Sequence, residues 1–271
     1  MHTFKRLVYH LFLYDGCFDS NVYKLHLACL AYFAKIFDQA IFVLAIDDTD
    51  NRDLIKTAEK TLLKNIPIRD IKFIVEKNND FREASTFYEQ IAKKLESLDG
   101  VTFFGHIKGA SNEFNPNIDI WQVYNWIIAV YFFSLFYMDE VIWYLITSPS
   151  FNTYGSLKCK WENIENKYSW LYSGTFFWIN GQRTAAFMKK NEIELPPLNN
   201  RYCAETFCGN IFKFNNAEAG SHKCFHYVAS SDVLFLNWYK YAEAFIEDFL
   251  DDDTKDDYYN FRAEMLKTIE I

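Results

Sequence analysis

Apolar runs and helical patterns alternate along the first 106 residues of the chain. Four short runs of β-forming residues are bounded by glycine or by polar turns, which is typical of buried strands. The segments between them repeat apolar residues at helical spacing or are polar throughout, as in exposed helices. The predicted strands are 7–13, 40–46, 71–75 and 101–104, and the predicted helices are 20–36, 53–63 and 82–98. This order predicts an α/β fold with a mostly parallel, Rossmann-like central sheet flanked by helices.

The second half of the chain contains the longest apolar stretch, 123–138. It is shorter than the roughly 20 residues of a membrane-spanning helix, and two acidic residues end it, so we expect a buried helix and no transmembrane segment. The remaining predictions are a strand at 141–146, a surface path at 148–167, strand-forming residues at 169–179, and helices at 182–190, from 204 and at 238–249. A short helix after 251–253 ends the chain, so we expect a main domain at 1–235 and a C-terminal helical extension at 236–271.

The strand 101–104 leads into a turn flanked by glycines that carries His106 and Lys108. Ligands of α/β sheets usually bind at the ends of central strands, and two proton-donating groups there suit a charged phosphate. We interpret this turn as the floor of a nucleotide-sugar site. The alternative is that His106 caps the turn and that Lys108 is solvated.

The composition limits the range of partners. The net charge is −8 and no run of Lys or Arg occurs, which argues against general binding of nucleic acid. Aromatic residues make up 19% of the chain; they can line a groove that stacks on sugars or bases, or reflect a biased genome composition. Six cysteines form no CxxC pair and no secretion signal precedes them, so we expect reduced thiols in a cytoplasmic protein.

Three patches of sequence carry a resemblance to a known family. They are NNDFREASTF at 78–87, FFGHIKG at 103–109, and YSGTFFW at 172–178 followed by RYCAE at 201–205. In this order they resemble glycosyltransferases of the GT-A type, and more narrowly bacterial enzymes that build surface polysaccharides. The resemblance implies a nucleotide-sugar donor, a glycan or lipid-linked glycan acceptor, and a cytoplasmic location, with a peripheral position at the inner membrane face left open.

The resemblance also bears on metal use. The family usually places Asp-x-Asp at the end of the corresponding strand, where the carboxylates hold a divalent metal on the diphosphate. Here that strand ends in His106 and Lys108, which can contact phosphate oxygens directly. The resemblance therefore implies a metal-independent enzyme without a cofactor. The alternative is a Mn or Mg site at Asp48 and Asp50, which can equally be a solvated turn.

The remaining donor-side residues follow from the same resemblance. Arg82, at a helix start, is placed beside the donor diphosphate, and its alternative is a surface ion pair. Asp47, Asp48 and Asn78 are placed at the ribose or base of the nucleotide. His226 is a late diphosphate contact or a buried polar residue; the cysteines and histidines around it fit no strong zinc spacing.

On the acceptor side, the resemblance makes Gly174 part of the wall of the acceptor site, with Trp178 or Tyr172 as a stacking surface. Core packing alone can explain Phe176 and Phe177. The same resemblance makes Glu205, at a helix start, the catalytic base that takes the proton of the attacking hydroxyl. Arg201, four residues earlier, can orient that carboxylate. The alternative is a Glu that only stabilises a helix N-terminus.

The resemblance therefore implies an inverting, metal-independent transfer of a hexose from a nucleotide donor to a hydroxyl of a glycan. Two alternatives stay open. One is a retaining or metal-dependent transferase that uses Asp48 and Asp50, and the other is a non-catalytic glycan- or nucleotide-binding module. The C-terminal helices can pack on the domain, on a second subunit as in a homo-oligomer, or on a membrane surface.

Overall fold

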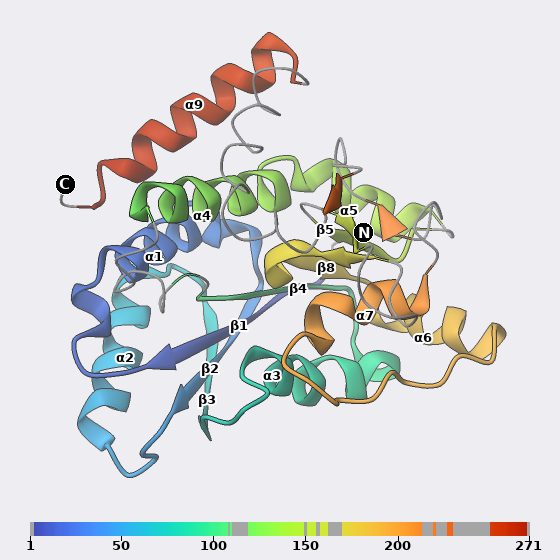
Figure 1. The fold of residues 1–271 in the computed structure, drawn as a ribbon, viewed down its shortest axis with the longest axis horizontal. Helices are drawn as coiled ribbons and strands as arrows, with labels where there is room; N and C mark the ends of the chain where they lie inside the picture. The colour runs from blue at the N-terminus through green and yellow to red at the C-terminus, as the bar shows by residue number, and fades with distance from the viewer. Residues whose placement is uncertain are drawn as a thin grey trace.

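Four parallel strands and three strands from the second half of the chain form one seven-stranded sheet (Figure 1). Its order is β3-β2-β1-β4-β8-β5-β9, and a second, three-stranded sheet has the order β10-β6-β7. The computed structural model describes residues 3–107, 109, 119–148, 151–155, 158–161, 170–212, 219–220, 227–229 and 250–269. The strands are β1 (Lys5–Leu13), β2 (Gln39–Ile46), β3 (Asp70–Lys77), β4 (Val101–His106), β5 (Thr153–Gly155), β6 (Lys158–Trp161), β7 (Leu171–Tyr172), β8 (Phe177–Ile179), β9 (Ala219–Gly220) and β10 (Tyr227–Ala229). In the larger sheet only β8 runs antiparallel to both of its neighbours, so the predicted mostly parallel α/β sheet is confirmed.

Polar side chains begin the helices where the sequence predicts. The Ser20 hydroxyl accepts a hydrogen bond from the Tyr23 amide at the start of α1, and Asn51 caps α2 in the same way. The α-helices are α1 (Asn21–Phe33), α2 (Arg52–Asn65), α3 (Glu83–Gln90), α4 (Ile120–Leu135), α5 (Met138–Thr147), α6 (Gly181–Lys190), α7 (Cys203–Ile211) and α9 (Asp252–Leu266). The predicted helix 82–98 is broken at Ile91 and continues as a 3-10 helix, Ala92–Ser97.

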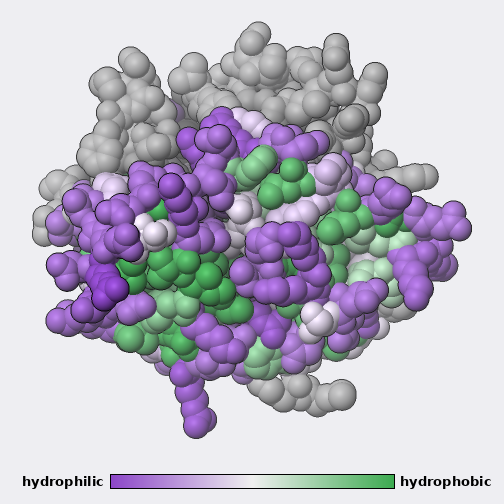
Figure 2. Space-filling model, turned by 90° about the horizontal axis from the view of Figure 1, so that it is seen from below, coloured by the Kyte–Doolittle hydropathy of each residue, from purple (hydrophilic) through white to green (hydrophobic). Residues whose placement is uncertain are grey.

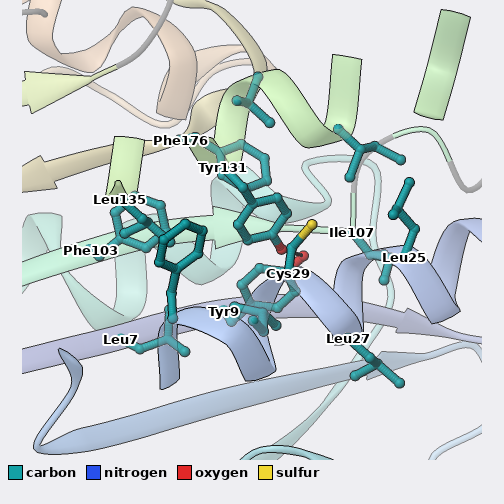
Figure 3. Packing of buried hydrophobic residues seen from close by; sticks show 14 of the residues in the cluster. Leu7, Tyr9, Leu25, Leu27, Cys29, Phe103, Ile107, Tyr131, Leu135 and Phe176 are labelled. Carbon is teal, nitrogen blue, oxygen red and sulfur yellow. Dashed lines mark hydrogen bonds between the residues drawn. The ribbon is translucent and has the colours of Figure 1, made fainter. Parts of the chain in front are cut away.

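Helices cover both faces of the sheet. On one face, α1, α2, α4, α5 and α9 enclose a core that includes Leu7, Tyr9 and Phe103 of β1 and β4, and Figure 3 shows Tyr131 of α4 meeting these strands. On the other face, α3, α6 and α7 pack on a second core. The alternation of side chains along β1 and β4 therefore divides their residues between two buried layers.

The strand predicted at 141–146 is wrong, because these residues belong to helix α5. Val141, Ile142 and Leu145 are buried, whereas Trp143 and Tyr144 are exposed. This spacing of i, i+1 and i+4 follows a helix, and a strand would bury alternate residues instead.

The predicted surface path at 148–167 is also partly wrong. The described residues Thr153 and Tyr154 are buried, because β5 pairs with β8 inside the larger sheet. The predicted helix at 238–249 lies outside the described residues. The last helix, α9, is 15 residues long and packs on α1 and α4, with the Phe261 ring 5.3 Å from the Phe33 ring.

No single helix in the described part of the chain is long and apolar enough to cross a membrane. Helices α4 and α5 reach that length together, but only as a pair bent by 47°. All residues from Val123 to Leu135 of α4 except the half-buried Asn125 are buried, as predicted for this helix. Seen from below, hydrophilic residues separate several hydrophobic areas of the surface (Figure 2).

Candidate functional site

The larger sheet reverses its winding direction between β1 and β4. From β1 the chain moves to β2 and then β3 on one side, and β4 returns to the other side of β1. In open α/β sheets, ligands bind outside the carboxyl ends of strands at such a switch point. His10 of β1 pairs in register with His106 of β4, so the two imidazoles lie on the same face of the sheet.

His10 is held by a chain of hydrogen bonds that crosses three elements. Its Nδ1 lies 2.9 Å from the hydroxyl of Thr86 in α3, and this hydroxyl donates to Glu76 Oε1 of β3 at 2.7 Å. Burial lowers the pKa of His10 from 6.5 to about 4, with Glu83 opposing that shift and His106 adding to it. The Glu76 pKa is raised, mainly by burial. His10 is therefore a neutral imidazole at neutral pH.

This shift predicts a pH-dependent loss of stability. The unfolded chain binds a proton at His10 near pH 6.5 and the folded chain only near 4, so the native state loses stability as the pH falls through this window. Between pH 7 and 4.5 the loss amounts to about 2 kcal/mol. Glu76 acts in the opposite direction, because its folded-state pKa is raised.

His10→Asn isolates the contribution of the imidazole. The Asn amide can still donate to Thr86 but cannot titrate. Urea unfolding at the two pH values is expected to show a smaller loss in the variant than in the parent. An identical loss in both proteins would contradict the assigned pKa.

His106 connects β4 to a turn in the second half of the chain. Its Nε2 donates to the carbonyl oxygen of Gly174 at 3.0 Å, and its Nδ1 lies 3.9 Å from Glu83 Oε1 at the start of α3. The residue is 5% exposed and belongs to β4 rather than to an open turn. Both nitrogens face oxygen acceptors of the protein, so His106 positions the turn and does not present an open imidazole to a diphosphate.

The turn bound by His106 has an unusual backbone. Gly174 has a φ of 79°, and a Cβ atom there would lie 2.7 Å from the Trp126 ring of α4. Thr175 follows with a φ of 61°, a conformation that few residues other than glycine adopt. Gly174 therefore marks a close approach, as expected, but in a 3-10 turn and not within a strand.

Thr175 links this turn to Glu205. Its hydroxyl donates to Glu205 Oε1 at 3.4 Å, and Glu205 lies in the first turn of α7 with 8% of its surface exposed. Arg201 is exposed just before α7 and bonds the Tyr202 hydroxyl. That bond is the main cause of its raised pKa, and Glu83 and Glu205 add to it. The structure therefore brings Arg201, Glu83 and Glu205 within electrostatic reach of one another.

Arg82 lies at the N-terminus of α3 with strained backbone angles, φ 49° and ψ −129°. The side chain of Asn79 accepts hydrogen bonds from the amides of Phe81 and Arg82 and fixes this turn. The Arg82 side chain is exposed. Arg82 directly precedes Glu83, whose carboxylate lies 3.9 Å from His106 Nδ1.

Asp47 and Asn78 meet at the carboxyl ends of β2 and β3. Asn78 Nδ2 donates to Asp47 Oδ1 at 3.0 Å. Both residues follow the carboxyl ends of parallel strands, at the same end of the sheet where β4 ends. The exposed carboxylate of Asp48 accepts from the amide of Asp50 at 3.0 Å, within a turn. Among the described residues, no group of three or more His, Cys, Asp or Glu side chains is arranged to hold a metal ion. The metal alternative at Asp48 and Asp50 stays a prediction.

Two expected acceptor contacts belong to the core instead. Tyr172 and Trp178 are 0% exposed; Tyr172 stacks on Phe177, and Trp178 donates to the Ser134 carbonyl and stacks on Phe37. Neither ring offers a face to a glycan, because Trp178 is buried in the core on one face of the larger sheet and Tyr172 is buried in the core on the other. Lys108 and His226 lie outside the described residues.

The sequence patterns missed the residues that surround the two histidines. Glu83, Thr86 and Glu76 come from α3 and β3, and no linear spacing connects them to His10. A polar residue inside the apolar run 7–13 was the available signal, since a buried histidine needs a hydrogen-bond partner. No protein-family model matches the chain, and no curated protein matches it.

Proposed function

We propose that the chain is a glycosyltransferase that transfers a hexose from a nucleotide-sugar donor to a hydroxyl of a surface glycan. The observation that carries the proposal is the polar cluster at the carboxyl edge of β1 and β4. It combines a buried carboxylate, Glu205, with a neutral histidine, His10, and exposed cations, Arg82 and Arg201. A sugar hydroxyl needs a proton acceptor and a diphosphate needs cations, so the cluster contains the groups that this reaction requires.

In the proposed reaction, Glu205 accepts the proton of the attacking hydroxyl. The hydroxyl oxygen forms a bond to the anomeric carbon while the bond from that carbon to the diphosphate breaks, and the diphosphate leaves with the electron pair. Inversion follows when the hydroxyl approaches opposite the leaving group. Thr175 fixes the Glu205 carboxylate through its hydroxyl, and His106 fixes the turn that carries Thr175.

The leaving diphosphate is assigned to Lys108 and the two arginines. A guanidinium binds two phosphate oxygens at once, and an ammonium neutralises them as a point charge. The part of His106 in this proposal changes from a direct phosphate contact to a positioning residue, because its Nε2 is bonded to Gly174. Asp47 and Asn78 remain assigned to the ribose or base.

Lys108→Ala tests the donor side of the proposal. Loss of a charge-assisted contact is expected to weaken binding of the nucleoside diphosphate by roughly 1.5 to 3 kcal/mol, or about 10- to 150-fold. Calorimetry with UDP, GDP and CDP measures this directly. Lys190→Ala, which removes an exposed lysine in the last turn of α6, is the control for a change of net charge. Equal affinity of the parent and Lys108→Ala would refute the assignment.

Chelation tests metal independence. We expect turnover to survive EDTA, and the double variant Asp48→Asn, Asp50→Asn to keep much of its rate, because the cations of the site neutralise the diphosphate directly. Loss of turnover in EDTA with recovery on addition of manganese would favour the metal-dependent alternative at these two aspartates.

A further inference from the structure

In the hydrogen-bond chain from Glu76 through Thr86 to His10, the number of hydrogens on each group determines which group donates. The Thr86 hydroxyl has a single hydrogen, and it donates this hydrogen to Glu76 Oε1. In the contact of 2.9 Å with His10, the Thr86 oxygen is therefore the acceptor, and His10 Nδ1 is the donor. A neutral imidazole with its proton on Nδ1 has a lone pair on Nε2. The chain thus holds His10 in one tautomer, with Nε2 as a hydrogen-bond acceptor.

The surroundings of His10 contain further acceptors. The groups that act on its charge are Glu83 of α3, His106 of β4 and Glu76 of β3. Among the residues that the structure describes, no hydrogen bond to His10 Nε2 is formed. His10 Nε2 can therefore accept a hydrogen bond from donors on a ligand.

The chemistry of a nucleotide sugar identifies which part of it can supply them. The oxygens of an ionised diphosphate only accept hydrogen bonds, whereas a hexose carries several hydroxyl groups that donate. We propose that His10 Nε2 accepts a hydrogen bond from a hydroxyl of the hexose bound at this edge, and that Thr86 and Glu76 are positioning residues that hold its tautomer. This inference rests on the proposed glycosyltransferase function and names the part of the substrate that His10 recognises.

The tautomer can be measured without any ligand. Two-bond ¹H–¹⁵N spectra of protein labelled with ¹⁵N-histidine distinguish a protonated from an unprotonated ring nitrogen. At pH 7 we expect His10 to carry its proton on Nδ1 in the parent and to lose this fixed state in Thr86→Val, which keeps the size of the side chain but removes the hydroxyl. Thr184→Val is the matched control, because the Thr184 hydroxyl is buried without a hydrogen-bond partner among the described residues.

In the control variant the His10 signals are expected to match those of the parent. A proton on Nε2 of His10 in the parent, or an unchanged tautomer in Thr86→Val, would overturn the positioning roles of Thr86 and Glu76.

The sugar contact is tested by comparing UDP-glucose, UDP-galactose and GDP-mannose with UDP and GDP alone. For a nucleotide sugar that binds by calorimetry, the ¹⁵N signal of His10 Nε2 is expected to shift, and the matching nucleoside diphosphate is expected to leave it unchanged. An equal shift with the diphosphate alone, or no shift with a bound nucleotide sugar, would overturn the contact. If no probe binds, the proposed function fails and the contact fails with it, while the tautomer measurement still decides the roles of Thr86 and Glu76.

Discussion

Glu205→Gln is expected to lower turnover at least about a hundredfold while leaving nucleotide binding nearly unchanged. Gln has the size of Glu and can still accept the hydrogen bond from Thr175, but it cannot take the proton of a sugar hydroxyl. General base catalysis typically contributes 100- to 10,000-fold in rate, so the expected loss starts at the low end of that range. Steady-state rates and calorimetry on the same preparations separate the two effects.

The control for Glu205→Gln is Glu194→Gln, which neutralises an exposed carboxylate between α6 and α7. We expect this variant to behave as the parent does. A shared loss of binding and rate in Glu205→Gln would indicate a structural glutamate. Parental turnover in Glu205→Gln would remove it as the base and direct the search to Asp15 and Asp47, which follow the carboxyl ends of β1 and β2.

Gly174→Ala is expected to destabilise the fold by about 2 to 5 kcal/mol. A left-handed backbone costs a residue with a Cβ roughly 1 to 2 kcal/mol, and overpacking against a rigid ring costs about 1 to 3 kcal/mol more. The new Cβ would lie 2.7 Å from the Trp126 ring. Because Gly174 accepts the hydrogen bond of His106 and precedes Thr175, the displaced turn should also lower turnover.

Gly16→Ala is the matched control for this prediction. Gly16 has almost the same φ, 77°, but its Cβ would meet no atom closer than 3.9 Å. It should therefore show only the backbone cost, about 1 to 2 kcal/mol in urea unfolding. Equal destabilisation by the two substitutions would mean that the Trp126 ring moves aside and that the turn is not tightly fixed.

The order of strands and helices could be predicted where the spacing of apolar residues in a segment fits only a strand or only a helix. The runs 40–46 and 101–104 are bounded by polar residues and glycine, and their burial on both faces leaves no helical alternative. The run 141–146 was ambiguous, because six apolar or aromatic residues in a row fit either period. Only the pattern of burial, with Trp143 exposed and Leu145 buried, identifies the helix.

The edge of the sheet that carries the candidate site could also be predicted, but not the contacts within it. His106, Arg201 and Glu205 were found because they lie at strand ends or helix starts. The partners of His10 lie 66 and 76 residues away in the sequence, at Glu76 and Thr86, and no local pattern encodes their contact. The aromatic residues led to a wrong expectation, because the sequence does not distinguish a ring that packs in a core, as Trp178 does, from a ring that stacks on a sugar.

Turnover of a panel of nucleotide sugars, measured as release of nucleoside diphosphate with and without EDTA, tests the central claim most directly. We expect the parent to release diphosphate from at least one donor when a glycan acceptor is present, and EDTA not to abolish this release. We expect Glu205→Gln to bind the same donor without comparable turnover. Binding of a nucleotide sugar with no turnover of any donor in the panel would instead favour a non-catalytic module and contradict the proposal that this chain is a glycosyltransferase.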